Sequence, residues 1–196
     1  KRAFDLVLAG LGLLLAAPVV AVIAVAIRLD STGPVFFRQQ RVGEGGKLFL
    51  MRKFRTMRLG AEKQELELAE ETGQGPPLFR KRPDDPRVTR VGRFLRRWSL
   101  DELPQLVNVL KGEMSLVGPR PELPWLVEQY EPWQRKRFAV PQGMTGWWQV
   151  SGRSDRADHR LRVEDDLFYI RNWSIWLDLR IVWMTAQAIV RGKGAY

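Results

Sequence analysis

The feature that most constrains the fold is a run without a charged residue from Leu6 to Ile27, LVLAGLGLLLAAPVVAVIAVAI. As a helix, this run is long enough to cross the hydrocarbon core of a bilayer. It is apolar on all faces, which argues against a core helix of a soluble domain, and no A-x-A-like site follows it, which argues against a signal peptide. The sequence therefore predicts insertion into a membrane.

Positive charge flanks this segment at both ends. Lys1 and Arg2 precede it, and Arg28 opens a basic remainder. Positive flanks are held on the cytoplasmic side of a membrane, so the charges favour both ends on one side. Pro18 removes a backbone donor in mid-segment and can kink the helix. We therefore expect residues 1–29 to form a re-entrant membrane helix that breaks at Pro18; a kinked single span is the alternative.

Composition narrows the chemistry. The 196 residues include no cysteine and one histidine, which excludes disulfides, thiol chemistry and cysteine or histidine zinc sites. A metal would be bound by carboxylate oxygens, which suit magnesium or calcium. The net charge of +10 points to anionic partners, namely nucleic acid, phosphorylated substrates or anionic lipid. The chain begins at Lys1 without methionine, and whether a further membrane domain precedes it stays open.

The rest of the chain, residues 30–196, predicts a small α/β domain that is mostly helical. Two β-favouring runs, GPVFFRQQRVG and KLFLMRKFRTM, are joined through Gly43 to Gly46 and predict a short β-hairpin. Lys53 and Arg55 lie two apart and would share one face of its second strand. They fit either a phosphate clamp or a solvated basic face, and the spacing alone favours the latter.

Helical spacing recurs in three further stretches. Residues 90–110 carry two apolar sets, and Gly112 ends the second helix. Residues 62–71 predict a surface helix, and a loop rich in Pro and Gly follows it. Within residues 169–190, a set at three- and four-residue intervals fits a core helix or an amphipathic helix in the membrane interface; it comprises Trp173, Trp176, Leu177, Arg180, Trp183 and Met184. The interfacial placement is favoured because a membrane segment is already present.

Two adjacent carboxylates, Asp101 and Glu102, stand just before Pro104. Ser99-x-x-Glu102 matches a capping box, and acidic residues suit the first turn of a helix. If Asp101 is instead the N-cap, Pro104 sits inside the first turn, where its missing donor costs little. Asp101 would then stay ionised at the positive end of a helix, available for magnesium or for nucleophilic attack. On spacing alone, the capping interpretation is favoured.

Several motifs together carry a resemblance to a known family. They are KRAFDL with the apolar segment, GPVFFRQQRVG, KFRTM, the long stretch RVTRVGRFLRRWSLDELPQLVNVLKGEMSLVGPRPE, and GMTGWWQVSGR. This set resembles the bacterial sugar transferases, the monotopic polyprenyl-phosphate phosphoglycosyl transferases, over nearly the whole chain. The re-entrant helix of that family breaks at a proline that corresponds to Pro18. The chain has Ala17 before it, where Ser is more common.

The resemblance implies transfer of a sugar-1-phosphate from a UDP-sugar to a polyprenyl phosphate of the undecaprenyl type, with release of UMP, as the first membrane step of polysaccharide or glycoconjugate assembly. The reaction would pass through a covalent phosphosugar-aspartate intermediate, with Mg²⁺ as the cofactor. The implied partners are UDP-sugar, polyprenyl phosphate and membrane lipid, and not nucleic acid. The implied location is the cytoplasmic face of the bacterial inner membrane. The sugar, the glycan pathway and a homodimer stay open.

The resemblance also assigns roles to individual residues. Asp101 corresponds to the catalytic nucleophile and is implied as a magnesium ligand, and Glu102 would support the site through metal or proton handling. The residues implied in substrate binding are Pro119, Arg120, Pro121, Arg153, Lys53, Arg55 and Arg96. Among these, Arg120 is implied at the uridine side and Arg153 at a phosphate, which suits the bidentate geometry of guanidinium.

Two rival functions follow from composition. A membrane-tethered nucleic-acid-binding protein would need basic residues interleaved with exposed aromatics on one face, whereas here they are spread along the chain and mixed with acids. A non-catalytic membrane scaffold would use the paired carboxylates only as a helix cap. Steeply salt-dependent DNA binding would support the first rival. Magnesium-dependent release of UMP from a UDP-sugar would separate an enzyme from the scaffold.

Overall fold

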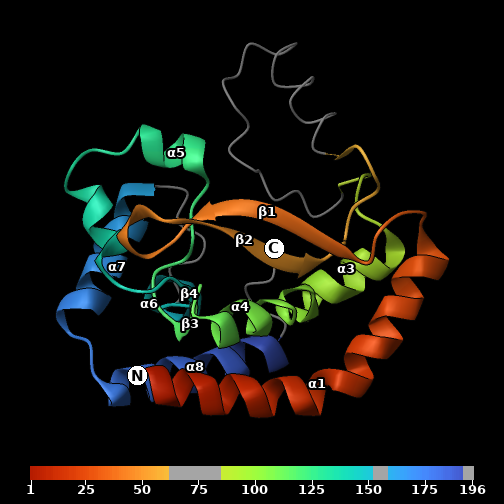
Figure 1. The fold of residues 1–196 in the computed structure, drawn as a ribbon, viewed down its shortest axis with the longest axis horizontal. Helices are drawn as coiled ribbons and strands as arrows, with labels where there is room; N and C mark the ends of the chain where they lie inside the picture. Colours follow the sequence, from red (N-terminus) through yellow and green to blue (C-terminus); the bar gives the residue numbers. More distant parts are fainter. Residues whose placement is uncertain (62–84, 152–158, 192–196) are drawn as a thin grey trace.

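In a computed structural model, the chain is described over residues 1–61, 85–151 and 159–191. Arg153, the predicted surface helix at 62–71 and most of the loop after it lie outside these residues. The apolar run forms α1 (Arg2–Asp30), a single α-helix with Pro18 inside it. Figure 1 shows α1 turning sharply partway along, as helices do where proline removes a donor. The expected break is therefore a bend within one helix.

Helix α1 has a first arm before Pro18 and a second arm after it, and both arms pack against the rest of the domain. The first arm places Ala9, which is fully buried, beside Met51 and Val109, and the second places Ile27 against Phe54. Elsewhere the helix is mostly exposed, since only 11% of its most apolar window is buried at a mean hydropathy of 2.7. Among the described residues, it is the one helix long and apolar enough to cross a membrane. Its apolar surface thus faces outward while both of its arms are held.

The predicted β-hairpin is confirmed. Strand β1 (Phe36–Val42) pairs antiparallel with β2 (Leu48–Phe54), and the short 3-10 helix η1 (Glu44–Gly46) joins them. Gly45 and Gly46 have φ of 63° and 79°, a conformation that glycine adopts without steric cost. Helix α4 lies between the hairpin and the first arm of α1 (Figure 1) and packs against both, while Met51 of β2 also reaches Ala9 of α1 directly.

The remaining elements complete a mostly helical α/β fold, as expected. They are α3 (Arg90–Arg97), η2 (Leu100–Glu102), α4 (Gln105–Lys111), β3 (Ser115–Val117), α5 (Pro124–Glu128), η3 (Gln134–Ala139), β4 (Gly143–Thr145), α6 (Trp147–Val150), α7 (His159–Arg171) and α8 (Ile175–Val190). Gly112 ends α4 at φ 82°, as predicted. Strands β3 and β4 form a parallel pair that the sequence pattern did not predict.

Helix α8 carries apolar side chains both on a buried inner face and on an exposed outer face. Ile181 is fully buried in a cluster with Val117 and Tyr169. Trp176 and Trp183 lie on the outside and are 77% and 65% exposed. The inner face therefore belongs to the core, and placement of the outer face in a membrane interface stays a prediction.

Candidate active site

The paired carboxylates lie in a tight turn before helix α4 rather than inside its first turn. Asp101 and Glu102 belong to η2, and Pro104 takes the N-cap position of α4. The capping-box interpretation is wrong, because the Ser99 side chain makes no capping hydrogen bond. Ser99 instead has φ 53°, the one positive φ outside glycine in the described part of the chain. Such a conformation costs roughly 1–3 kcal/mol and tends to occur at functional sites.

Glu102 is held between two cations that come from distant parts of the chain. Its Oε1 accepts hydrogen bonds from Lys53 Nζ at 2.8 Å and from Arg120 Nη2 at 2.7 Å. Lys53 comes from β2, and Arg120 follows β3. All three side chains are largely buried. Burial would raise the pKa of Glu102, but the charges and hydrogen bonds of Arg120 and Lys53 hold that pKa well below its usual value.

Asp101 sits beside this ion pair with its carboxylate uncommitted. Its Oδ2 lies 4.0 Å from Lys53 Nζ, and within the described residues no side chain or backbone group donates a hydrogen bond to it. Burial raises the pKa of Asp101, and the negative charge of Glu102 raises it further, against the pull of Lys53. The two neighbouring carboxyls thus have pKa values shifted in opposite directions, which is a recurring mark of active sites.

Two of the other predicted site residues, Arg96 and Arg55, have different surroundings. Arg96, in the last turn of α3, donates to Thr56 Oγ1 at 2.9 Å, and its charge lowers the pKa of Asp101, so it belongs to the same neighbourhood. Arg55 is buried and donates to the carbonyls of Ser31 and Thr32, at the end of α1. The structure thus brings Arg96 to the carboxylate pair and Arg55 to the end of α1.

The Pro119-Arg120-Pro121 turn is fixed at its backbone. Pro119 and Pro121 are buried, the Pro119 carbonyl accepts a hydrogen bond from the Gly143 amide at 2.7 Å, and Arg41 donates to the Pro121 carbonyl at 3.3 Å. A Cβ atom on Gly143 would overlap the backbone at the start of this turn, so glycine is required there. The prolines and these contacts together hold Arg120 toward Glu102.

A buried arginine that the sequence analysis missed supports the same turn. Arg137 is 1% exposed and donates to the Arg120 carbonyl at 3.0 Å and to Glu122 Oε1 at 3.1 Å. It also donates to the Tyr130 hydroxyl at 2.8 Å and pairs with Asp166 Oδ2 at 2.6 Å. Burial raises the pKa of Asp166 to about 7, despite the attraction of Arg137.

No local signal marks Arg137 in the sequence. It is the last of three consecutive basic residues, and its neighbours Arg135 and Lys136 are exposed. Its main partners, Arg120 and Asp166, lie 17 and 29 positions away in the chain, and only the tertiary fold brings them together. Arg137 therefore joins the Pro-Arg-Pro turn to α7 through the interior.

The carboxylate pair fits magnesium, although with few protein ligands. The described residues contain no group of three or more His, Cys, Asp or Glu side chains that would enclose an ion. Magnesium is commonly bound through one or two carboxylates, with water and substrate phosphates supplying the rest. The uncommitted oxygens of Asp101 suit such a site, whereas Glu102 Oε1 is already shared by two cations.

Comparison with known proteins gives a consistent result. The profile of the family described as bacterial sugar transferase matches residues 1–192. The chain is 45% identical over 203 residues to the UDP-glucose:undecaprenyl-phosphate glucose-1-phosphate transferase of Escherichia coli, and 43% identical over 203 residues to the undecaprenyl-phosphate galactose phosphotransferase of Salmonella typhimurium. It is 41% identical over 200 residues to an Aeromonas hydrophila enzyme named for N-acetylgalactosamine.

These alignments cover 100% of the chain but only 41%, 41% and 44% of the respective relatives. The chain thus spans about two fifths of the length of the curated relatives it matches. Their names share undecaprenyl phosphate and differ in the sugar, which is glucose, galactose or N-acetylgalactosamine.

Proposed function

The chain belongs to the bacterial sugar transferase family, and on that premise we propose that it transfers a sugar-1-phosphate from a UDP-sugar to a polyprenyl phosphate of the undecaprenyl type, with release of UMP. The observation that carries this proposal is the Asp101-Glu102 pair, in which an uncommitted carboxylate lies beside one that is locked between Lys53 and Arg120. A nucleophile next to fixed cations suits displacement at a diphosphate.

The proposed reaction has two displacements. An Asp101 carboxylate oxygen attacks the β-phosphorus of the UDP-sugar, an O–P bond forms, and the bond to the bridging oxygen breaks, so that UMP leaves with that oxygen. A phosphate oxygen of the polyprenyl phosphate then attacks the same phosphorus. This forms the lipid diphosphate sugar and returns Asp101 as a carboxylate. Splitting one transfer between anions into two steps keeps the reacting phosphorus at a fixed place.

The fixed charges divide the remaining work. Lys53 and Arg120 offset the negative charge of the diphosphate, and Glu102 orients both of them, so we assign it a positioning role rather than proton transfer. The lowered pKa of Glu102 supports that assignment, because the group stays ionised. Arg96 lies near Asp101 and is proposed to bind a substrate phosphate, as is Arg153 by resemblance. Magnesium, held through Asp101, would neutralise the diphosphate and stabilise departing UMP.

We propose that the protein is monotopic, with α1 entering and leaving one face of the bacterial inner membrane, on its cytoplasmic side. This rests on the anchoring of both helix ends to one body. Lys1 Nζ pairs with Asp178 Oδ2 at 2.6 Å at the start of α1, and Asp30 Oδ2 accepts a hydrogen bond from the Val91 amide at 2.9 Å at its end. A helix so tied cannot place its ends on opposite sides without losing these contacts.

The decisive experiment is an assay of UMP release over a panel of UDP-sugars, with polyprenyl phosphate and magnesium. We expect release for one or a few sugars, loss of release with a chelator, and accumulation of an adduct on the protein when the lipid phosphate is omitted. Transfer that proceeds in the Asp101→Asn variant would overturn the assigned mechanism. Absence of UMP with every UDP-sugar, from protein that is folded by thermal melting, would overturn the proposed activity.

A further inference from the structure

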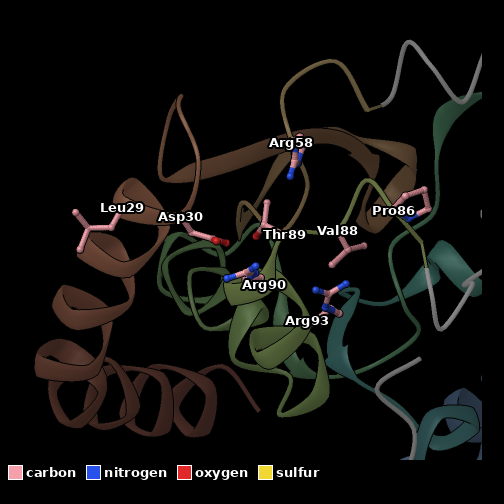
Figure 2. A pocket seen from close by; sticks show the side chains of 8 residues that line it. All are labelled: Leu29, Asp30, Arg58, Pro86, Val88, Thr89, Arg90 and Arg93. Carbon is pink, nitrogen blue, oxygen red and sulfur yellow. The ribbon is translucent and has the colours of Figure 1, made fainter.

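A hollow of about 430 Å³ lies at the C-terminal end of α1, and none of its lining residues belongs to the carboxylate site. Figure 2 shows three arginine side chains around it: Arg58 comes from the segment after β2, and Arg90 and Arg93 come from α3. Asp30, near the end of α1, also lines it. The hollow thus lies between the C-terminal end of α1 and the arginine-bearing face of α3.

The three arginines are available to an outside anion. All three are exposed, and in the described part of the chain none of their side chains makes a hydrogen bond or ion pair. Asp30 is the one carboxylate in the lining, and it already accepts a hydrogen bond from the Val91 amide. Three guanidinium groups against one carboxylate leave an excess of positive charge in the hollow.

Backbone groups contribute little to this site. The first amides of α3 are already bonded, Val91 to Asp30 and Gly92 to the Thr89 hydroxyl. A ligand would therefore be bound by side chains. Guanidinium groups match phosphate oxygens in a bidentate geometry, so a phosphate group is the ligand that three such side chains favour.

One exposed apolar side chain lines the hollow, and two more follow its arginines in the sequence. Leu29, in its lining, is 83% exposed, and Leu59 and Phe94, each next in sequence to an arginine of the hollow, are 61% and 57% exposed. Large exposed apolar side chains interleaved with basic ones are typical of surfaces that meet lipid rather than of sites for soluble phosphates.

We propose that this hollow binds the phosphate headgroup of an anionic phospholipid, with the acyl chains beside Leu29 and Leu59. The proposal rests on the membrane seating argued above and goes beyond the transfer reaction. A lipid bound here would hold the second arm of α1 and the start of α3 at a fixed depth in the membrane. Since α3 also carries Arg96, the site would fix the height of the catalytic carboxylates above the bilayer.

The test counts lipids on the full chain by native mass spectrometry, from micelles of neutral detergent that contain phosphatidylglycerol or phosphatidylcholine. The Arg90→Gln/Arg93→Gln double variant is compared with a matched control, Arg135→Gln/Lys136→Gln, which removes the same charge from exposed positions on η3. An arginine near an anionic surface contributes about 1 kcal/mol, or about fivefold in affinity.

We expect saturable binding of one phosphatidylglycerol, weakened about 25-fold in the double variant and little changed in the control. Equal affinity in wild type and double variant, equal loss in both variants, or equal binding of phosphatidylcholine would each overturn the proposal. Competition by inorganic phosphate as strong as by phosphatidylglycerol would identify a free-phosphate site instead, and would also overturn it.

Membrane seating is measured separately, as retention of the protein in membranes after a carbonate wash. Release by the wash would show that the seating itself is wrong, whatever the lipid titration gives. Retention in membranes together with loss of the specific lipid in the double variant is the combined result that the proposal requires.

Discussion

Arg120 Nη2 lies 2.7 Å from Glu102 Oε1, and the same oxygen accepts a hydrogen bond from Lys53. Glu102 therefore fixes the guanidinium group of Arg120 and the ammonium group of Lys53 beside Asp101 before any substrate binds. Burial and the proximity of Glu102 raise the pKa of Asp101, which makes its ionised form a stronger base and nucleophile. One carboxylate organises the charges of the site, and its neighbour is left to react.

Replacing Asp101 with asparagine should remove the nucleophile while keeping the size of the side chain. We expect transfer to fall by about 10³-fold or more, and the adduct formed with UDP-sugar alone to disappear from the intact mass of the protein. Thermal melting should stay close to that of the wild type, because Asp101 accepts no hydrogen bond within the described residues. Persistence of the adduct in this variant would show that another residue attacks.

Replacing Glu102 with glutamine should change the pH profile as well as the rate. Glu102 repels a second negative charge, so its loss should lower the pKa of Asp101 and move the acid limb of kcat/KM to lower pH. The rate should fall because Lys53 and Arg120 lose their common partner. Glu113→Gln, which removes a carboxylate paired with Arg52, is the control. An acid limb that stays in place would mean that Glu102 does not act on Asp101 electrostatically.

Lys53 and Arg55 should separate into a substrate-side and a structural residue. Arg55→Gln loses hydrogen bonds to the Ser31 and Thr32 carbonyls, so it should lower the free energy of unfolding by about 1.5–3 kcal/mol and leave the KM for the UDP-sugar unchanged. Lys53→Gln should raise the KM for the UDP-sugar and leave the free energy of unfolding nearly unchanged. The two variants are compared by thermal melting and by UMP release. A raised KM for Arg55→Gln at normal stability would return Arg55 to the substrate site.

Arg137 should position Arg120 without touching the substrate. Arg137→Lys keeps the buried charge but loses the planar fork that reaches the Arg120 carbonyl and Glu122, so we expect the KM for the UDP-sugar to rise about tenfold with a smaller change in kcat. Arg135→Lys, an exposed neighbour, is the control. Because the site is buried, only protein that melts cooperatively is compared. A tenfold fall in kcat with no change in KM would point to a purely structural role for Arg137.

The parts of the fold that the sequence predicted are those set by neighbouring residues. The glycines between β1 and β2 and the glycine after α4 act locally, and both predictions were confirmed. Neither predicted helix start, Ser99 or Asp101, is the start of α4, because Asp101 and Glu102 form the separate turn η2 and Pro104 takes the N-cap position of α4. Local spacing does not contain that information.

Long-range contacts were beyond any local pattern. The family resemblance assigned Lys53, Glu102 and Arg120 to one site. The Glu102 oxygen that accepts hydrogen bonds from the other two depends on how β2, η2 and the turn after β3 pack, which the sequence pattern does not give. The Arg137 network gave no sequence signal because a buried arginine is recognisable only through its partners. Which face of α8 is buried also could not be predicted from the sequence, because its inner and outer faces are both apolar.

Asp166 should make stability fall as pH rises through the weakly acidic range. Its pKa is raised to about 7 in the folded protein by burial, against an ordinary value of 3.8, so the folded state holds a proton that the unfolded state has released. That contribution is complete below about pH 4 and is lost as pH rises to 7, with a limiting slope of about 1.4 kcal/mol per pH unit. The Asp166→Asn variant has no ionisable carboxyl group at this position. We therefore expect the melting temperature of the wild type, relative to this variant, to decline between pH 5 and about pH 7 and to level off above that, as measured in neutral detergent. A difference that is flat over this range would mean that Arg137 keeps Asp166 ionised throughout, and an increase with pH would reverse the sign of the assigned shift.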